Sequence, residues 1–222
     1  MSTGPVPPTT NPPSNQSPGP SPFYGVDPIK LQQLLWPHVT FTGYQKDIIY
    51  SVEENDETYV PAANMMGKDF TAGFIALSYF LRHRPVRVIT TSVKDEHLDV
   101  LWGEIDRYIR TARHPVTGEE NCLVAERGGP LIYLHQEIRR VYKGVEEKDS
   151  YLKGQVSKKG EGMAGHHAPF TLMIADEASG VDDIVHNMSQ GWAKRMLMIG
   201  NPNPCTNFFR RGVAAGDLPR VA

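Results

Sequence analysis

Two adjacent carboxylates at the end of an apolar run are the strongest indication of chemistry in this chain. The run covers residues 172–175, has the length of a strand, and leads directly into Asp176 and Glu177. In open α/β sheets, ligands bind beyond the carboxyl ends of the strands. At such a place one carboxylate suits a magnesium ion, and the other suits a water molecule that attacks phosphate. A helix N-terminus also favours acidic residues, so a purely structural interpretation stays open.

A glycine–lysine pair far earlier in the chain supplies the other half of a nucleotide site. Residues 58–63 have strand character and lead towards Gly67 and Lys68, where a helical pattern begins. A Walker A loop follows the pattern G-x-x-x-x-G-K-[ST], and its backbone N–H groups and lysine bind phosphates. Residues 62–69 occupy that span. The members that we expect to contact nucleotide are Ala62, Asn64, Met66, Gly67, Lys68 and Asp69.

Two residues of this loop depart from the Walker A pattern. Ala62 replaces the first glycine, and Asp69 replaces the hydroxyl residue that normally binds magnesium. A carboxylate is a competent ligand for a hard cation, although its charge beside a triphosphate is unfavourable unless the metal lies between them. We therefore expect Asp69 and Asp176 to bind Mg²⁺. Lys68 and Glu177 are the predicted catalytic residues of an ATP-hydrolysing site.

Strand and helix patterns alternate along the chain and should place both motifs on one sheet. The predicted helices begin at Asp27 and near Asp182, or cover residues 44–53, 68–81 and 95–109. In the first of them Leu31, Leu34 and Leu35 are expected to share the buried face. The predicted strands cover residues 58–62, 86–91, 130–134, 172–175 and 195–199. This alternation predicts a P-loop α/β fold with a mostly parallel sheet covered by helices on both faces.

Composition excludes several other classes of protein. The 222 residues are 40% hydrophobic and carry a net charge of −2, which is ordinary for a globular protein and not that of a basic nucleic-acid binder. Basic clusters at residues 139–140, 153–159 and 210–211 fit a local nucleic-acid surface or solvated charge. No apolar run approaches the roughly 20 residues that cross a bilayer. Cys122 and Cys205 lie too far apart for a metal or redox motif.

The first 24 residues differ sharply in composition from the rest. They are mostly Pro, Ser, Thr, Gly and Asn, with little apolar surface to offset the entropy lost on ordering. We expect residues 1–24 to be a disordered tail and residues 25–222 to form one ATPase domain.

Further segments, in a consistent order, resemble a particular family. Residues 41–45 resemble the adenine-reading glutamine motif of helicase-like ATPases, with Gln45 on the adenine edge and Tyr44 packed beside it. Residues 90–92 and the helix with residues 101–105 resemble the strand-to-helix motif that follows the phosphate loop. Three other segments flank the carboxylate pair: residues 165–167, 199–202 and 208–209. From about residue 40 to 212, the chain resembles the ATPase domain of the phage terminase large subunit.

The resemblance implies a motor that hydrolyses ATP with Mg²⁺ and moves double-stranded DNA into a viral capsid. It implies that Asn201, in a motif Gly-Asn-Pro at residues 200–202, senses the γ-phosphate and couples its loss to movement. A turn that closes a strand would suit the same three residues. The implied partners are DNA, a portal protein and the small terminase subunit. The implied assembly is a homo-oligomeric ring in the cytoplasm of the infected bacterial host.

Several departures from the family keep alternatives open. Residues 62–66 contain no arginine, and Ala164 stands where many terminases carry one. Arg140, Lys158 or Lys159 are candidates to replace that charge. Only about twenty residues follow Asn201, so we expect no nuclease domain in this chain. The alternative functions are a helicase-like nucleic-acid-dependent ATPase and a non-hydrolysing nucleotide-binding assembly module, which Asp69 and the missing arginines would suit.

Overall fold

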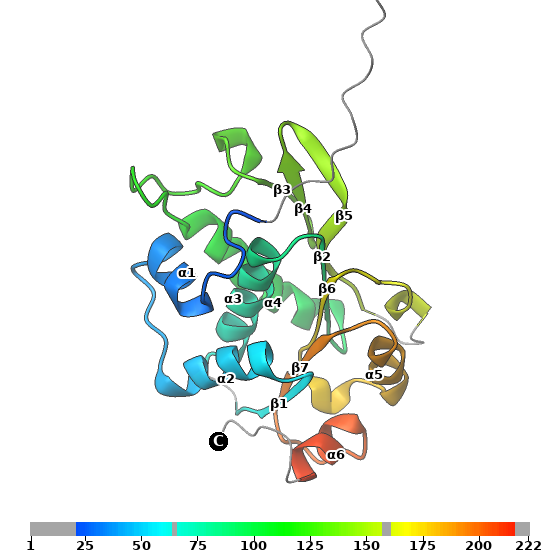
Figure 1. The fold of residues 1–222 in the computed structure, drawn as a ribbon. Helices are drawn as coiled ribbons and strands as arrows, with labels where there is room; N and C mark the ends of the chain where they lie inside the picture. The colour runs from blue at the N-terminus through cyan, green and yellow to red at the C-terminus, as the bar shows by residue number, and fades with distance from the viewer. Residues whose placement is uncertain (1–20, 64–65, 157–160, 216–222) are drawn as a thin grey trace, which may run out of the picture.

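A mixed sheet forms the centre of this computed structural model, which describes residues 21–63, 66–156 and 161–215. Within those residues the sheet has seven strands in the order β1-β7-β6-β2-β5-β4-β3 (Figure 1). Neighbouring strands from β1 to β5 are parallel, and β4 is antiparallel to both β5 and β3. The strands are β1 (Glu57–Pro61), β2 (Val86–Thr91), β3 (Leu131–Leu134), β4 (Glu137–Tyr142), β5 (Val145–Gly154), β6 (Phe170–Ala175) and β7 (Arg195–Gly200).

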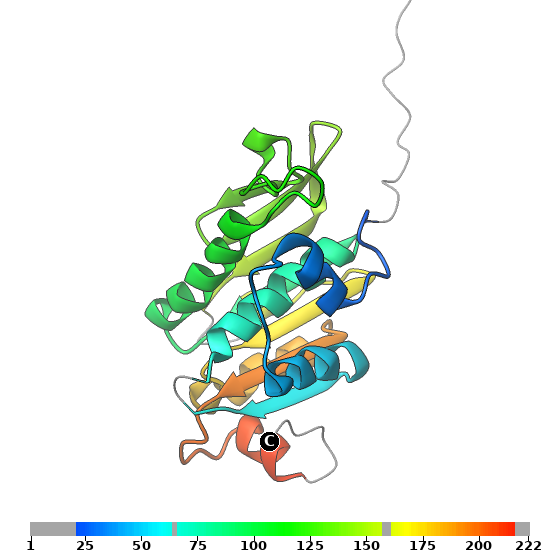
Figure 2. The same cartoon turned by 90° about the vertical axis from the view of Figure 1, so that its left-hand side faces the viewer.

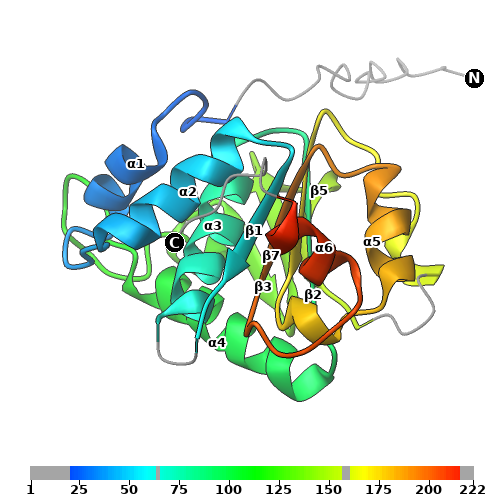
Figure 3. The same cartoon turned by 90° about the horizontal axis from the view of Figure 1, so that it is seen from below.

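Helices cover both faces of the sheet, as the alternation of patterns predicts. The helices α1 to α4 pack on one face and lie in front of the sheet in Figure 2, whereas α5 and α6 pack on the other (Figure 3). The α-helices are α1 (Pro28–Leu35), α2 (Gly43–Glu54), α3 (Lys68–Arg82), α4 (Asp95–Thr111), α5 (Asp183–Gln190) and α6 (Phe208–Ala214). The short 3₁₀ turns are η1 (Ala125–Arg127), η2 (Glu161–Met163) and η3 (Ala178–Gly180).

The helices on the first face form where local patterns predict them. Asp27 caps α1, since its carboxylate accepts hydrogen bonds from the backbone N–H groups of Ile29 and Lys30, both at 2.9 Å. Leu31 and Leu35 are buried, but Leu34 is 45% exposed, so its predicted place on the buried face is wrong. Leu34 follows Leu31 by three residues and directly precedes Leu35. The buried apolar stripe of α1 is therefore narrower than a stripe that would include all three leucines.

The hairpin of β4 and β5 is the main element that the patterns do not predict. Its two strands are rich in charge, and only alternate residues such as Ile138, Ser150 and Leu152 are buried. Lys143 and Gly144 join the strands with φ values of 51° and 77°, as a tight two-residue hairpin turn requires. Neither β4 nor β5 therefore contains an apolar run long enough to predict a strand. The short helix α6 was also not predicted.

The domain begins earlier than residue 25. Ser21 is 4% exposed and its hydroxyl donates a hydrogen bond to the carbonyl of Leu81. Phe23 packs against the core, and the ring of Tyr24 lies edge-on to Phe170 with centroids 6.1 Å apart. The predicted tail therefore wrongly includes residues 21–24, because these contacts join residues distant in sequence.

Candidate nucleotide-binding site

The carboxyl ends of four parallel strands meet at one edge of the sheet and bring the predicted motifs together. The loop of residues 62–67 follows β1, Asn201 follows β7, Asp176 follows β6 and Ser92 follows β2. Because β7 lies between β1 and β6, Asn201 leaves the sheet between the loop and the carboxylates. This is the edge at which ligands bind in open α/β sheets.

Gly67 begins α3 in a conformation that favours glycine. Its φ of 70° and ψ of 32° lie in the left-handed region, and no side chain caps the helix there. A β-carbon on Gly67 would also come within 2.9 Å of the amide nitrogen of Gln45. The glycine thus lets the loop approach α2 while the N–H groups of the first turn of α3 stay available to a phosphate.

Gln45 lies beside this loop but has a structural bond as well. Its side-chain oxygen accepts from the backbone N–H of Thr42 at 3.0 Å, and the Thr42 hydroxyl accepts from the backbone N–H of Gln45 at 3.3 Å. This reciprocal capping box starts α2. It directs the amide nitrogen of Gln45 towards Gly67, where it stays available to a base edge. The role of Gln45 in binding adenine stays a prediction.

Lys68 is brought into direct contact with the carboxylate pair. Its Nζ donates to Asp176 Oδ1 at 2.9 Å and to Glu177 Oε1 at 2.6 Å, and it lies 3.4 Å from Asp69 Oδ1. The side chain of Lys68 is 8% exposed, and that of Asp176 is 3% exposed. One ammonium group therefore faces three carboxyl groups in a largely dry place. Such an excess of negative charge attracts cations.

Burial and neighbouring charge set the proton affinity of this cluster. Burial of the Asp176 carboxyl raises its pKa to about 6; Lys68 opposes the shift, and the charges of Asp69 and Glu177 add to it. Burial disfavours the charge on Lys68, but attraction to Asp176 and the hydrogen bond to Glu177 outweigh this and raise the pKa of Lys68. The lysine is therefore firmly protonated and suited to neutralise phosphate oxygens.

Glu177 is held in an unusual backbone conformation. Its φ of 49° and ψ of 42° are left-handed, which is uncommon for a residue with a side chain and often marks a functional site. The strand β6 ends at Ala175, and the turn η3 begins directly after Glu177. Gly200 at the end of β7 lies against this turn, because a β-carbon there would come within 2.8 Å of the Ala178 nitrogen.

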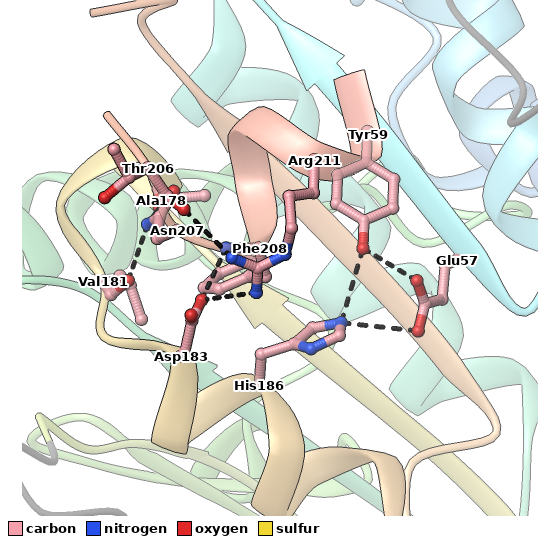
Figure 4. A network of polar contacts seen from close by, with 10 residues as sticks. All are labelled: Glu57, Tyr59, Ala178, Val181, Asp183, His186, Thr206, Asn207, Phe208 and Arg211. Atoms are coloured by element: carbon pink, nitrogen blue, oxygen red, sulfur yellow. Dashed lines mark hydrogen bonds and ion pairs between the residues drawn. The ribbon is translucent and has the colours of Figure 1, made fainter. Parts of the chain in front are cut away.

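A polar network fixes the far side of the same turn to α6 (Figure 4). The amide nitrogen of Asn207 donates to the carbonyls of Ala178 and Val181 at 2.8 and 2.7 Å. Asp183 at the start of α5 accepts from the Phe208 backbone N–H at 2.5 Å and pairs with Arg211 at 3.0 Å. The turn that carries Glu177 is thus held by the helix that follows β7.

The same network continues to β1, the strand that leads into the loop. Tyr59 donates to Glu57 at 2.7 Å, and His186 Nε2 lies 3.4 Å from both side chains (Figure 4). The His186 ring stacks on Phe208 with an interplanar angle of 8°. Gly212 of α6 lies so close to the Tyr59 ring that a β-carbon would overlap it at 2.2 Å. Both halves of the site therefore share α6 as a support.

The remaining predicted residues lie around the loop to different extents. Ala62 is buried, and its backbone N–H donates to the Gly200 carbonyl at 3.0 Å, which extends the β1–β7 ladder. Met66 is 50% exposed, and Tyr44 is half-buried with a pKa that burial raises. Asn64 lies outside the described residues, and its contact with nucleotide stays a prediction.

Among the described residues, Arg140 and Ala164 bring no positive charge to the site. Arg140 is buried, and its guanidinium donates to the carbonyls of Phe80 and His83 at the carboxyl end of α3. Lys68 begins that helix, so Arg140 is at the wrong end of it, and its suggested role near the γ-phosphate within one chain is wrong. The carbonyl of Gly165, next to Ala164, accepts from Arg87 at 3.2 Å near the amino end of β2. Lys158 and Lys159 lie outside the described residues.

The donor set fits a magnesium ion that is shared with a nucleotide. In the described part of the chain no three His, Cys, Asp or Glu side chains are grouped to hold a metal by themselves. Mg²⁺ typically takes one or two carboxylates and completes its shell with phosphate oxygens and waters. Asp176 would be one such carboxylate, and Asp69 Oδ1 is buried without a hydrogen-bond partner among the described residues. Within the same residues, no helix combines the length and the apolar surface needed to cross a membrane.

Two residues near this site carry no identifying signal in the sequence. Ser92 directly follows Thr91, which pairs with Ala175, but nothing in the spacing of residues distinguishes its hydroxyl from those of Thr90 and Thr91. Asn207 carries no signal, because its two acceptors are backbone carbonyls of the turn after Glu177.

Solved structures provide an independent comparison. The ATPase domain of the large terminase of Thermus phage P74-26 matches over 82% of this chain and 72% of that chain, with a TM-score of 0.58 and 12% identity. A mutant of that domain matches over the same shares, with a TM-score of 0.61 and 13% identity.

The large terminase of bacteriophage HK97 matches over 85% of this chain and 40% of that chain, with a TM-score of 0.53 and 16% identity. The chain has the fold of a phage large terminase ATPase domain. No family model and no curated protein matches the sequence. At 12–16% identity the likeness establishes the fold.

Proposed function

We propose that this chain is the ATP-hydrolysing domain of a DNA-packaging motor of the terminase type. The observation that carries the proposal is the contact of Lys68 with Asp176 and Glu177, at 2.9 and 2.6 Å. A loop lysine and a strand-end carboxylate pair are the two parts that P-loop hydrolysis needs, and the fold joins them across 108 residues. The fold of the terminase ATPase domains supports the same conclusion.

The contacts suggest how each side chain acts on a bound triphosphate. The phosphates compete with the carboxylates for the Lys68 ammonium, which then neutralises the β- and γ-phosphate oxygens. Asp176 and Asp69 would hold a Mg²⁺ ion, which would supply neutralising charge to the phosphates. Glu177, released from Lys68, accepts a proton from the attacking water or orients it. Asn201, between the two motifs, detects whether the γ-phosphate is present.

Two substitutions test hydrolysis and binding separately. Lys68→Ala should abolish turnover and weaken ATP binding, because the charge on the phosphates is lost. Glu177→Gln should retain binding of a fluorescent ATP analogue while stopping turnover, since an amide keeps the shape but accepts no proton. Lys30→Ala and Glu119→Gln, at exposed positions, are the matched controls. Parental turnover in Glu177→Gln would show that the catalytic assignment is wrong.

Asp69 favours one rival function. A carboxylate in place of the usual hydroxyl raises the negative charge beside a triphosphate, which suits a module that binds nucleotide without hydrolysing it. The parental chain separates the two functions when it is assayed with DNA and with partner proteins. Nucleotide binding without turnover under every such condition would support the binding module.

We further propose that the polymer moved is double-stranded DNA, delivered to a capsid through a portal protein with the help of a small terminase subunit. The proposed active form is a homo-oligomeric ring in the cytoplasm of an infected bacterium. A strand-displacement assay tests the nearest rival, a helicase-like ATPase. A packaging motor translocates a duplex without opening it, so ATP-dependent release of a displaced strand would favour the helicase.

A further inference from the structure

Ser92 is a buried hydroxyl beside the predicted metal ligand. It directly follows β2, and the backbone N–H of Asp176 donates to the carbonyl of the preceding residue, Thr91, at 2.9 Å. The parallel register pairs Thr91 with Ala175, so Ser92 and Asp176 are the next neighbours across the two strands. Both residues lie at the edge of the sheet where the phosphate loop lies.

The alternation of side chains places Ser92 and Asp176 on the same face of the sheet. Two residues before Ser92, the hydroxyl of Thr90 accepts from Trp102 Nε1 of α4 at 3.0 Å. Two residues before Asp176, Ile174 packs in the core cluster that contains α3 and α4. Successive residues of a strand point to opposite faces, so Ser92 and Asp176 continue the face of Thr90 and Ile174. Lys68 contacts Asp176 from this face.

The hydroxyl of Ser92 is buried and forms no hydrogen bond within the described part of the chain. Ser92 is 4% exposed, and its Oγ has no hydrogen-bond partner among the described residues. Asp69 Oδ1, in the first turn of α3, is buried and also lacks a hydrogen bond, although it forms an ion pair with Lys68 at 3.4 Å. Buried polar atoms are nearly always hydrogen-bonded, so an unpartnered hydroxyl next to Asp176 across the two strands indicates a polar ligand.

The chemistry of that ligand follows from the neighbouring groups. Mg²⁺ retains several waters when one or two carboxylates and phosphate oxygens bind it. A neutral hydroxyl can donate to a carboxylate and accept from such a water at the same time. The usual Walker A hydroxyl is absent because Asp69 occupies its position. Ser92 offers a hydroxyl from the neighbouring strand instead.

We propose that the Ser92 hydroxyl, next to Asp176, donates a hydrogen bond that positions the hydrated cation of the nucleotide complex. This inference rests on the proposed nucleotide function and adds a residue to it. Ser92 is a positioning residue, because it acts on the ion through water or through Asp176. Residues that hydrogen-bond to metal ligands typically change metal affinity by 10- to 100-fold when they are substituted.

The experiment measures the affinity of the parent, Ser92→Ala and Ser92→Cys for Mn²⁺, in the presence of a saturating non-hydrolysable ATP analogue. The free Mn²⁺ signal in electron paramagnetic resonance gives the bound fraction. We expect Mn²⁺ to bind Ser92→Ala about 10-fold more weakly than the parent. Ser92→Cys keeps the size of the side chain but only a weak donor, and its affinity should lie between the two.

Controls separate this role from a general effect on folding. Ser78→Ala removes another buried hydroxyl, one bonded to the Ile75 carbonyl within α3, and should keep the parental Mn²⁺ affinity. Affinity for the analogue in EDTA should be equal in all four proteins, because Ser92 acts through the cation. Thermal melts followed by circular dichroism show whether each variant is folded.

The outcomes distinguish the inference from the function on which it rests. Parental Mn²⁺ affinity in both Ser92 variants would overturn the inference and indicate that an ordinary buried water satisfies the hydroxyl. An equal loss in Ser78→Ala would also overturn it, because the effect would then be one of packing. If the parent binds neither the analogue nor Mn²⁺, the proposed nucleotide function itself fails.

Discussion

Gly200 lies directly against the backbone of Glu177. A β-carbon at Gly200 would come within 3.2 Å of the Glu177 carbonyl carbon and 2.8 Å of the nitrogen of Ala178. The end of β7, the strand between β1 and β6, thus contacts the backbone that orients Glu177, the proposed base. A shift of either backbone must move the other, because interiors are close-packed.

We therefore expect Gly200→Ala to reduce turnover much more than nucleotide binding. The new methyl group must displace the turn of Glu177, and a misplacement of about 1 Å costs about 10²-fold in rate. Single-turnover hydrolysis and analogue binding measure the two effects. Gly191→Ala is the control, because Gly191 has an ordinary φ of −70° and its nearest atom, the Met188 carbonyl oxygen, would be 3.5 Å away. Equal losses in both variants would contradict the prediction.

The network at the base of β1 predicts a dependence of stability on pH. The hydrogen bond from His186 is the main cause that lowers the pKa of Glu57 from 4.5 to about 2; burial opposes the shift, and bonds from Tyr59 and Gln190 add to it. A carboxyl group with a depressed pKa stabilises the fold above its ordinary pKa, and this contribution is lost as the pH falls towards its folded value. The affected window is therefore about pH 4.5 to 2.

Glu57→Gln should flatten this part of the stability profile. Urea unfolding at pH 6, 4 and 3 measures the free energy of unfolding of each protein. The parent should lose more stability between pH 4 and 3 than Glu57→Gln, whereas the exposed Glu54→Gln should follow the parent. Identical slopes in the parent and in Glu57→Gln would show that the network does not hold this carboxylate in its charged form.

Two deletions test where the domain begins. Removal of residues 1–20 should leave the melting temperature unchanged, because that segment has little apolar surface. Removal of residues 1–24 also removes the Ser21 hydrogen bond and the contacts of Phe23 and Tyr24, and should lower the melting temperature by about 4 °C. Calorimetry of both proteins measures the difference. Equal melting temperatures would contradict the role given to residues 21–24.

The position of Arg140 predicts that hydrolysis requires assembly. Helix α3 has 15 residues, so its two ends lie about 20 Å apart, and Arg140 is bonded to the end opposite Lys68. An arginine at the γ-phosphate is worth roughly 10³ to 10⁵ in rate, and this one cannot supply it within the chain. Turnover per subunit should therefore fall when the protein is diluted until only monomers remain. Brisk turnover that stays constant on dilution would show that a basic residue of the same chain acts at the site.

The sequence by itself determined the local parts of this protein. The strand β6, which leads into Asp176, is apolar because it is buried on both faces. The spacing of Leu98, Leu101 and Ile105 follows the period of a helix. Gly67 and Lys68 predict a phosphate loop because a turn that leads into a helix N-terminus is encoded by residues that are close together in sequence. Such features depend on neighbours in the chain, and a single sequence contains them.

The tertiary structure alone decided which of these parts meet. The insertion of β7 between β1 and β6 places Asn201 between the loop and the carboxylates, and hydrogen bonds between strands far apart in sequence produce that order. The position of Arg140 also depends on tertiary packing. The charged residues around it in the sequence suggest an exposed side chain, but the β4–β5 hairpin packs its guanidinium on the carboxyl end of α3. Ser92 and Asn207 join the site because of register and close approach, which are properties of packed elements and leave no mark in the spacing of residues.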